Sequence, residues 1–483
     1  EDGGEEEGGG APLDRVTADL LGAAARLLLE GGDHMEHHNN ATPPLLAKCA
    51  WKDLATIAWS YAHCGHGGNA TVDLLSAISH EACARTTPHT GGDDADAPPP
   101  LPRDVACLCW ALSSVLADDH RLRCATDDLL DAASRFVAAH PTLRRWGRED
   151  LVQLASALAR ARRDDRETLR RILVEASARL HRCASWEISI LLWCQARLYL
   201  RPDGGGDDDV FARFPSDAAA VLLERMRGDP DGAPLGPQEL SNVAWSATVL
   251  EAHGGGSEEG VTELLQRIFS VAERDGPRGD EHAHQLWQAA YLLSTGDCPA
   301  ATSSISPHFY TELQRCWTAE KSRRKKSSRR HLAVSRTLGL MGVAHHNEHD
   351  EDIDVAIVLD AGCGWTQYAT AEEGGGKTGG GRARRHRVAV EFDGPDHFTT
   401  LREGGPRPRA LGHTVLKYRC LKRLGWAVVR VPYFEFDRIP FWASMERQRY
   451  LQRMLHTHDN ISFSSGDVSE YRRLFPNRQS RFD

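Results

Sequence analysis

The stretch Arg387–Phe398, RVAVEFDGPDHF, followed after a short loop by Leu411–Pro432, LGHTVLKYRCLKRLGWAVVRVP, decides the fold of the C-terminal part of this chain. The first run predicts a buried β-strand, in which alternate side chains share a face. Glu391 and Asp393 then point to the same side of an otherwise apolar strand. Because charged groups in a core are costly unless a cation, a metal or a hydrogen-bond network meets them, this acid pair requires a partner.

The second run supplies a candidate partner for the acid pair. Residues Thr414–Leu424 predict a helix that ends at a glycine, and Trp426–Pro432 predicts a second apolar strand. Lys417 falls within the apolar stripe of this helix, whereas the other basic residues of the helix fall outside it. A lysine on a buried face is rarely left unpaired, so we expect Lys417 to lean towards Glu391 or Asp393.

This segment closely resembles the RAP domain, a small α/β domain similar to the very-short-patch-repair branch of the restriction-endonuclease-like fold. The matching motifs are EFDGPDHF, LGHT, LKYRCLKRLGW, VPYFEF and RQRYLQRML, with Phe436 standing where that family often carries Trp. DIDVAIVL, residues 352–359, matches the preceding strand and puts Asp354 where nuclease relatives hold a metal-binding aspartate. The resemblance covers about a quarter of the chain, and it places the domain at residues 331–458.

The resemblance leaves an enzymatic function open. A metal-dependent nuclease of this fold needs clustered carboxylates to hold Mg²⁺ and an adjacent base or lysine to position water. The candidate catalytic residues are Asp354, Glu391, Asp393, His397 and Lys417, with Asp354 and Glu391 as the candidate metal ligands. Against this function, Asp393 stands where nuclease relatives keep a catalytic lysine, and Lys417 could instead be a salt-bridge partner in a retired site. We therefore expect no cofactor, or Mg²⁺ only if the domain is an endoribonuclease.

Residues 13–320 carry an internal repeat of the form acid–apolar–x–x–apolar–small or apolar–Trp. Its copies are DLATIAW, DVACLCW, EISILLW, ELSNVAW and EHAHQLW, ending at Trp59, Trp110, Trp193, Trp245 and Trp287, and a degenerate copy, DLVQLAS, ends at Ser156. A second amphipathic segment follows each copy, so the repeat predicts about six helix pairs. One pair cannot bury both of its faces, and stacking into an α-helical solenoid follows. A Trp at a fixed place on an amphipathic helix more often packs in the core than stacks on a base, so we expect core packing.

The first helices of the repeat contain AWSYA, CWALS and AWSAT, and they resemble octotricopeptide repeats and the helical repeats of Fas-activated serine/threonine kinase-family proteins. Members of both groups commonly end in a RAP domain and act on organellar RNA. The resemblance therefore implies a post-transcriptional regulator of RNA processing, maturation or stability. It implies a mitochondrial matrix or chloroplast location, single-stranded or structured organellar RNA as the partner, and other ribonucleoprotein components beside it.

Charge is distributed unevenly along the chain. Residues 321–483 hold 29 Lys and Arg against 19 Asp and Glu, a balance of +10, and subtraction from the totals of 58 and 68 leaves −20 for residues 1–320. The run KSRRKKSSRR, residues 321–330, is a basic linker, and RARRHR at 382–387 is a second basic cluster. Such clusters favour contact with a polyanion. The candidate RNA-binding residues are Arg323, Arg324, Lys325, Lys326, Arg384, Arg385, His397, Lys417, Arg419 and Lys422.

Composition gives no sign of a membrane protein or a secreted protein. No stretch approaches the roughly 20 apolar residues of a membrane span, and the scattered cysteines, without a CxxC pair, indicate reduced thiols in a non-secreted protein. Residues 1–12 are expected to form an acidic tail without a signal pattern, from which a transit peptide could be missing, and residues 459–483 a C-terminal tail. A non-enzymatic scaffold, whose solenoid holds other proteins, remains an alternative to an RNA-binding factor.

Overall fold

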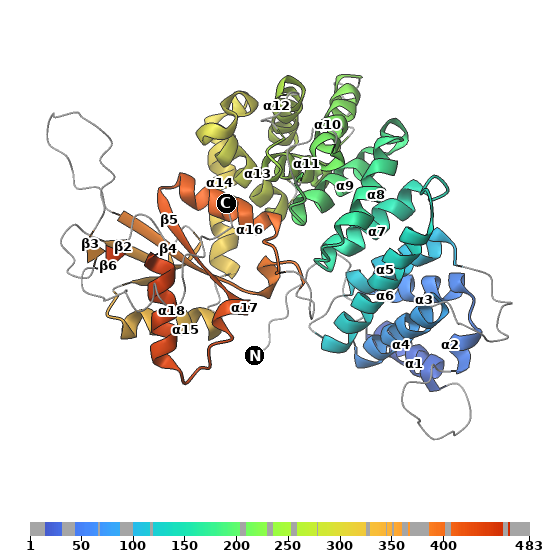
Figure 1. The fold of residues 1–483 in the computed structure, drawn as a ribbon. Coiled ribbons are helices and arrows are strands. Elements are labelled where there is room, and N and C mark those ends of the chain that lie inside the picture. Colours follow the sequence, from blue (N-terminus) through green and yellow to red (C-terminus); the bar gives the residue numbers. More distant parts are fainter. Residues whose placement is uncertain are drawn as a thin grey trace. The chain divides into compact units, whose positions relative to one another are not determined.

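The structure is a computed structural model, and it describes residues 15–30, 44–65, 68–86, 100–115, 119–202, 209–228, 235–252, 258–277, 279–324, 329–343, 345–349, 352–359, 366–367, 386–400, 407–456 and 462–463. The chain forms two compact units, Glu1–Ala252 and His253–Asp483. Helices fill the first unit and the start of the second, and a small mixed sheet with its own helices follows (Figure 1). This order confirms the predicted fold class, a helical array followed by a small α/β domain.

The described part of the first unit is helical. Two helices, α1 (Arg15–Glu30) and α2 (Pro44–Lys48), come before the repeats. The repeats then give α3 (Trp51–Cys64) with α4 (Asn69–Thr86), α5 (Pro102–Ser114) with α6 (His120–Ala139), α7 (Arg148–Arg160) with α8 (Arg166–Ser177), α9 (Ser185–Arg197) with α10 (Val210–Gly228), and α11 (Pro237–Val249). A 3-10 turn, η1 (Leu180–Arg182), joins α8 to α9.

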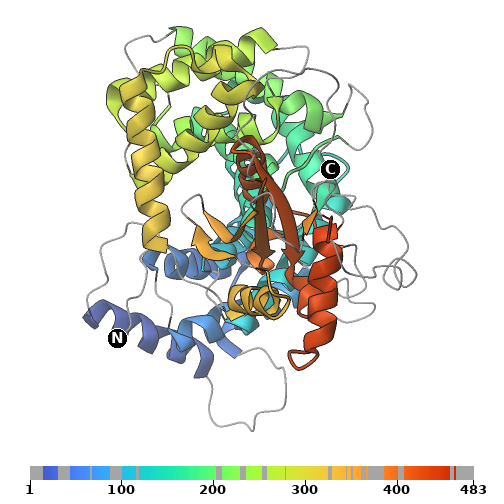
Figure 2. The same cartoon turned by 90° about the vertical axis from the view of Figure 1, so that its left-hand side faces the viewer.

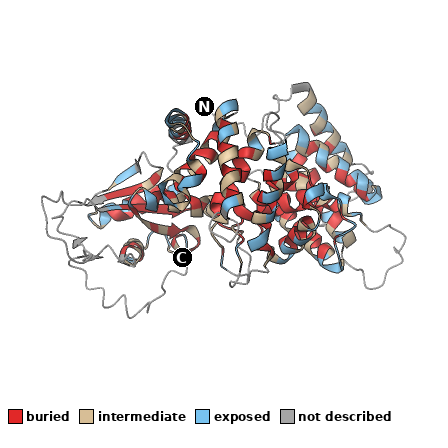
Figure 3. Cartoon of the chain, turned by 90° about the horizontal axis from the view of Figure 1, so that it is seen from above, coloured by how far each residue is buried: buried red, intermediate tan, exposed pale blue. Residues whose placement is uncertain are grey.

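The helix pairs of the first unit stack in two layers. The first helices of the pairs, α3, α5, α7, α9 and α11, pack side by side in chain order, and the second helices, α4, α6, α8 and α10, do the same. The apolar side chains between them are almost fully buried and include Leu54, Leu108, Leu154, Ile188 and Val243. Figure 3 colours the buried residues of these helices red. Stacking therefore buries the faces that a single pair would leave exposed.

The acid that opens the repeat motif marks where the first helix of a pair begins. Three of these carboxylates accept a hydrogen bond from the backbone N–H of the residue before the helix: Asp53 from Ala50 (3.0 Å), Asp150 from Gly147 (2.8 Å) and Glu187 from Ala184 (2.6 Å). In each case the acid is the third residue of its helix. It satisfies an N–H group at the helix start and places negative charge at the positive end of the helix dipole.

The repeat tryptophans differ in burial although they share a motif position. Trp245 and Trp287 are each 4% exposed, which agrees with the expected core packing. Trp59 is 40% exposed, so for this copy the expectation was wrong. Its ring stacks on His63 of the same helix face, with the ring centroids 4.8 Å apart. The motif fixes the place of the tryptophan on the helix, whereas the elements packed over that place decide its burial.

The second unit begins with the rest of the array. It contains α12 (Glu258–Asp275), α13 (Asp280–Leu292) and α14 (Pro307–Arg324). Between the last two lie a π-helical turn, η3 (Leu293–Asp297), and a 3-10 turn, η4 (Pro299–Thr302). Trp287 of α13 stacks on Trp317 of α14, with ring centroids 4.1 Å apart and ring planes at 16°. This aromatic contact helps to hold the two helices together.

The α/β module of the second unit contains a four-stranded sheet with the strand order β1-β2-β4-β5. Its strands are β1 (His346–His349), β2 (Ile353–Leu359), β4 (His386–Asp393) and β5 (Trp426–Pro432). β2 pairs antiparallel with β1 and β4, whereas β4 and β5 are parallel and are joined by α16 (Gly412–Arg423). The predicted strand, helix and second strand are therefore confirmed. A separate antiparallel pair is formed by β3 (Thr366–Gln367) and β6 (Ser462–Phe463).

Helices cover both faces of the four-stranded sheet. On one face, α15 (Arg329–Leu340) and α18 (Ser444–His456) share a core with Val388, Val390 and Phe392 of β4. On the other face, Ala389 of β4 packs with Leu421 of α16. Two short helices, η5 (Pro395–His397) and α17 (Tyr433–Phe436), follow β4 and β5. The sheet and these helices are seen from a second side in Figure 2. The alternation predicted for β4 thus separates its side chains between two cores.

The boundary between the two compact units does not coincide with the end of the repeat. The division at Ala252 falls inside residues 13–320, which the repeat pattern assigns to one array. The helices α12 to α14 group with the α/β module, where α16 packs against α13.

In the basic linker, α14 reaches Arg324 and α15 begins at Arg329. The predicted tail at 1–12 lies outside the described residues, and the predicted tail at 459–483 is described only at β6. None of the helices in the described part is long and apolar enough to cross a membrane.

Candidate functional site

The crossover between β4 and β5 brings the predicted acid pair and the lysine together. Glu391 and Asp393 leave β4 on the side that α16 covers, and they are 2% and 1% exposed. Lys417 lies one helical turn before Leu421, which packs on this side of the sheet. Gly425 follows the helix with a φ of 86°, a left-handed conformation that glycine adopts without strain, and the chain then turns into β5.

Lys417 pairs with Glu391. Its Nζ atom lies 2.6 Å from Oε2 of Glu391 and 3.6 Å from Oδ2 of Asp352. The contact confirms that the lysine meets the acid pair, and it identifies Glu391 as the partner. Burial alone would lower the pKa of Lys417, but the surrounding carboxylates outweigh burial and raise the pKa, so the side chain stays charged. Burial raises the pKa of Glu391, and the attraction of Lys417 opposes that rise.

Asp354 joins the same cluster from β2. Its Oδ2 atom accepts a hydrogen bond of 2.8 Å from the backbone N–H of Phe392. Its own backbone N–H donates to Oε1 of Glu391 over 3.3 Å. Asp354 and Glu391 are therefore neighbours, as the resemblance to nuclease relatives implied, and both are engaged by donors of the protein itself.

Asp393 has different partners. Arg430 of β5 donates from Nε to Oδ2 of Asp393 over 3.0 Å, and the Tyr418 hydroxyl donates to Oδ1. The guanidinium of Arg430 also lies over the Tyr418 ring, 4.4 Å from its centroid. Burial, together with the Asp393 carboxylate, raises the pKa of the Tyr418 hydroxyl well above its ordinary value. Sequence reasoning missed Arg430 and Tyr418. The one available signal was a single arginine inside the apolar run WAVVRVP.

His397 lies at the edge of the cluster. Its Nδ1 atom is 3.1 Å from the Thr414 hydroxyl and 3.9 Å from Oδ1 of Asp393. Burial lowers the pKa of His397, although the nearby Asp393 carboxylate works in the opposite direction. The neutral imidazole is therefore the favoured form in the folded chain.

The described cluster does not fit a Mg²⁺ site. Mg²⁺ requires several oxygen ligands in octahedral geometry. Here the Oε2 atom of Glu391 meets the ammonium of Lys417, and the Oδ2 atom of Asp354 accepts from a backbone N–H. Among the residues that the structure describes, no group of three His, Cys, Asp or Glu side chains could hold a metal ion. Lys417 supplies the positive charge that Glu391 meets in this cluster.

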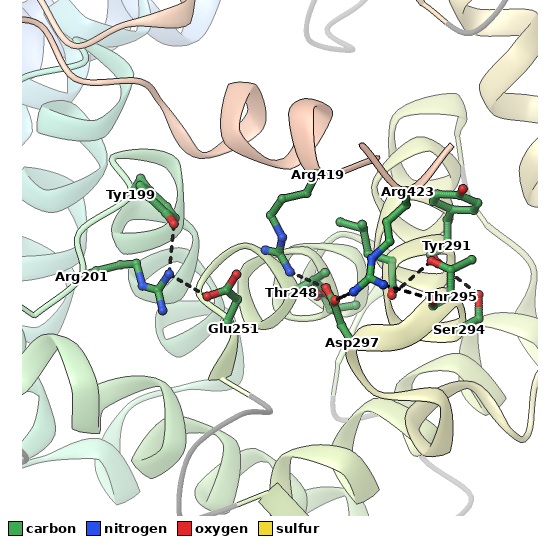
Figure 4. Close-up of polar contacts among 12 residues, drawn as sticks. Tyr199, Arg201, Thr248, Glu251, Tyr291, Ser294, Thr295, Asp297, Arg419 and Arg423 are labelled. Carbon is green, nitrogen blue, oxygen red and sulfur yellow. Dashed lines mark hydrogen bonds and ion pairs between the residues drawn. The ribbon is translucent and has the colours of Figure 1, made fainter. Parts of the chain in front are cut away.

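Two of the basic residues of α16 point to the array. Arg419 and Arg423 each form an ion pair with one carboxylate oxygen of Asp297, at the end of η3 (Figure 4). Arg423 also donates to the carbonyl oxygen of Thr295 over 3.3 Å. The side chain of Asp297 is only 12% exposed. This pairing gives Arg419, a candidate RNA-binding residue, a partner within the protein.

The other candidate RNA-binding residues are spread over the second unit. Lys422 is exposed on α16, whereas Lys417 and His397 belong to the buried cluster. The backbone of Arg323 and Arg324 ends α14, and their side chains are not described. Lys325, Lys326, Arg384 and Arg385 lie outside the described residues. Their proposed contacts with RNA stay predictions.

The geometry defines the C-terminal module as a small α/β domain in which the crossover helix and the strand after it supply the cations that meet two buried acids of β4. The family model of the RAP domain matches residues 390–454, which run from β4 into α18. This chain therefore carries a RAP domain in its C-terminal part, as the motifs predicted.

Proposed function

We propose that this chain is an RNA-binding protein that acts on organellar transcripts after transcription, in their processing, maturation or stability. The observation that carries the proposal is the RAP domain at residues 390–454 at the end of a stacked helical array. RAP domains are associated with RNA binding. Stacked helix pairs add an extended surface that a single strand of RNA can follow. The proposed partners are single-stranded or structured RNA and other components of a ribonucleoprotein.

Charge supports a role of the C-terminal part in holding the RNA backbone. Residues 321–483 carry a balance of +10, from 29 Lys and Arg against 19 Asp and Glu. In the described part of the RAP domain, Lys422, Arg438 and Arg449 are exposed. Each phosphate that such a side chain neutralises releases counterions, so binding becomes stronger as salt is lowered.

A salt titration of binding to single-stranded RNA tests the proposal. We expect binding at about 50 mM salt that weakens steeply as salt rises. Each phosphate contact should contribute about −0.7 to the slope of log K against log salt. Absence of binding at that low salt concentration would contradict the proposal.

Charge reversal tests which part holds the phosphates. The variant Arg323→Glu with Arg324→Glu is expected to weaken binding and to flatten the salt dependence. The matched control is Arg144→Glu with Arg145→Glu, two exposed arginines of the first unit, and it is expected to have a smaller effect. Equal RNA binding by the wild type and the first variant would favour the scaffold alternative.

The location in a mitochondrial matrix or a chloroplast is a further part of the proposal. It is supported by the likeness of AWSYA, CWALS and AWSAT to repeats of organellar RNA factors. Crosslinking in cells, followed by sequencing of the bound RNA, would give the transcripts and the compartment together. Recovery of nuclear-encoded messages alone would contradict an organellar role.

A further inference from the structure

The segment between α17 and α18 exposes two neighbouring aromatic rings. Phe441 is 78% exposed and Trp442 is 74% exposed, and they are the most exposed of the large apolar side chains that the structure describes. Met445, at the start of α18, is 62% exposed beside them. Exposed apolar surface of this kind marks a binding site more often than a random surface does.

The two rings are arranged so that each keeps a face open. Their centroids are 4.9 Å apart and their planes meet at 83°. An edge-to-face pair is a favourable arrangement in itself, so the rings hold one another in place. Because the planes are nearly perpendicular, the pair offers stacking surfaces in two directions.

Hydrogen bonds hold the backbone around the rings. The N–H of Ala443 donates to the carbonyl oxygen of Pro440 over 3.0 Å, and the N–H of Ser444 donates to that of Trp442 over 2.9 Å. Arg447 of α18 donates from Nη2 to the carbonyl oxygen of Ile439 over 3.0 Å. Binding to a fixed segment loses less conformational entropy than binding to a mobile one.

Positive charge predominates in the segment that carries the rings. Residues 438–453 hold four arginines and one glutamate. Arg438 and Arg449 are exposed, and Arg449 lies one helical turn after Met445 on the same side of α18. Asp437, the acid next to Arg438, is paired with Arg330 over 2.9 Å. The surface thus combines flat apolar rings with cations, which suits a ligand that carries both bases and phosphates.

We propose that Phe441 and Trp442 form a stacking platform for unpaired bases of a single-stranded RNA, with Arg438 and Arg449 on the adjoining phosphates. The inference rests on the proposed function and names a site for it. A protein partner fits less well, because a stable protein interface uses about 20–30 residues a side and this apolar surface comprises three side chains among arginines. Stacking is tolerant of sequence, so the platform would add affinity without selecting a base.

The test compares two forms of one RNA. The probe is a labelled 20-nucleotide single strand of mixed sequence, and its counterpart has the same phosphates but no bases. Phe441→Leu with Trp442→Leu keeps apolar side chains but removes the rings, and we expect about 5- to 100-fold weaker binding of the strand with bases. Binding of the abasic strand should stay as in the wild type. Phe441→Tyr with Trp442→Phe keeps the rings and is expected to restore binding.

The controls separate this inference from the proposed function. Trp186→Leu changes a tryptophan of the first unit that is 41% exposed, and it should leave both affinities unchanged. If the wild type binds and the double leucine variant binds the strand with bases as tightly as the wild type does, the platform is overturned and the RNA-binding function stands. An equal loss on both strands would also overturn it, because the rings would then not act on bases. If the wild type binds neither strand, the proposed function fails and the platform fails with it.

Discussion

Lys417 and Glu391 meet inside the RAP domain with Nζ and Oε2 only 2.6 Å apart, although one lies on a helix and the other on a strand. The contact joins α16 to β4 at the place where the strand would otherwise bury an unmatched carboxylate. A buried ion pair adds little net stability over an apolar pair, but loss of one partner leaves a buried charge behind. The pair therefore makes the fold sensitive to substitution at either position.

The first prediction concerns this pair. We expect Lys417→Met to lower the free energy of unfolding by about 3–5 kcal/mol, because Glu391 must then stay charged in the core or take up a proton. Urea unfolding of the full chain, followed by circular dichroism, measures the change. Adding Glu391→Gln to Lys417→Met should recover part of the loss. Lys422→Met, at an exposed position of the same helix, should change stability by less than about 0.5 kcal/mol.

The second prediction concerns Asp297. Its two carboxylate oxygens hold Arg419 and Arg423, so Asp297→Ala should lower stability by about 1–3 kcal/mol. Amide hydrogen exchange should become faster in α16, the helix that carries both arginines. Asp275→Ala is the control, since Asp275, which pairs with Arg274, is 39% exposed against 12% for Asp297. Equal effects of the two substitutions would show that the Asp297 contacts contribute nothing specific.

The third prediction follows from the lowered pKa of His397. Burial favours the neutral imidazole in the folded chain, so the unfolded chain binds more protons just below pH 6.5. The free energy of unfolding should therefore fall as the pH drops below about 6.5, by at most about 1.4 kcal/mol per pH unit from this one group. His397→Gln should lose that part of the pH dependence, whereas His308→Gln, at an exposed position, should keep it. Parallel pH profiles for wild type and His397→Gln would refute the prediction.

The fourth prediction concerns the start of the repeat helices. Asp150→Ala removes the acceptor for the N–H of Gly147, 2.8 Å away, and should destabilise the first unit by about 1 kcal/mol. Glu149→Ala changes the neighbouring acid, which is exposed, and should have a smaller effect. Thermal unfolding of the two variants side by side decides the matter. A larger effect of Glu149→Ala would mean that helix-dipole charge, and not the hydrogen bond, sets the helix start.

The strand, helix and strand of the RAP domain could be predicted because their signals are local. Alternation within RVAVEFD assigned side chains to two faces, and the apolar stripe of α16 identified Lys417 as the inward-facing lysine. A charge in a buried stripe demands a partner, so the pairing with the acids followed. The choice of Glu391 over Asp393 did not follow from the pattern: Arg430, whose register partner on β4 is Glu391, donates to Asp393 instead, and Lys417 meets Glu391.

Contacts between distant segments could not be predicted. Arg419 and Asp297 are separated by 122 positions, and nothing in either segment indicates the other. The exposure of Trp59 was also hidden, because the motif is the same where the tryptophan is buried. In both cases the decisive quantity is the packing of one element on another, which a local pattern does not contain.

The bond from an acid to the residue before its helix has a consequence for the array as a whole. Motif ends are separated by as few as 37 positions (Ser156 to Trp193) and by as many as 52 (Trp193 to Trp245). Since the start of α3, α7 and α9 is encoded within a few residues, a longer connection before one of these helices does not displace it. Added loop length carries only a slowly growing entropic penalty. The array can therefore accept insertions at its turns while the side chains along its length keep their spacing.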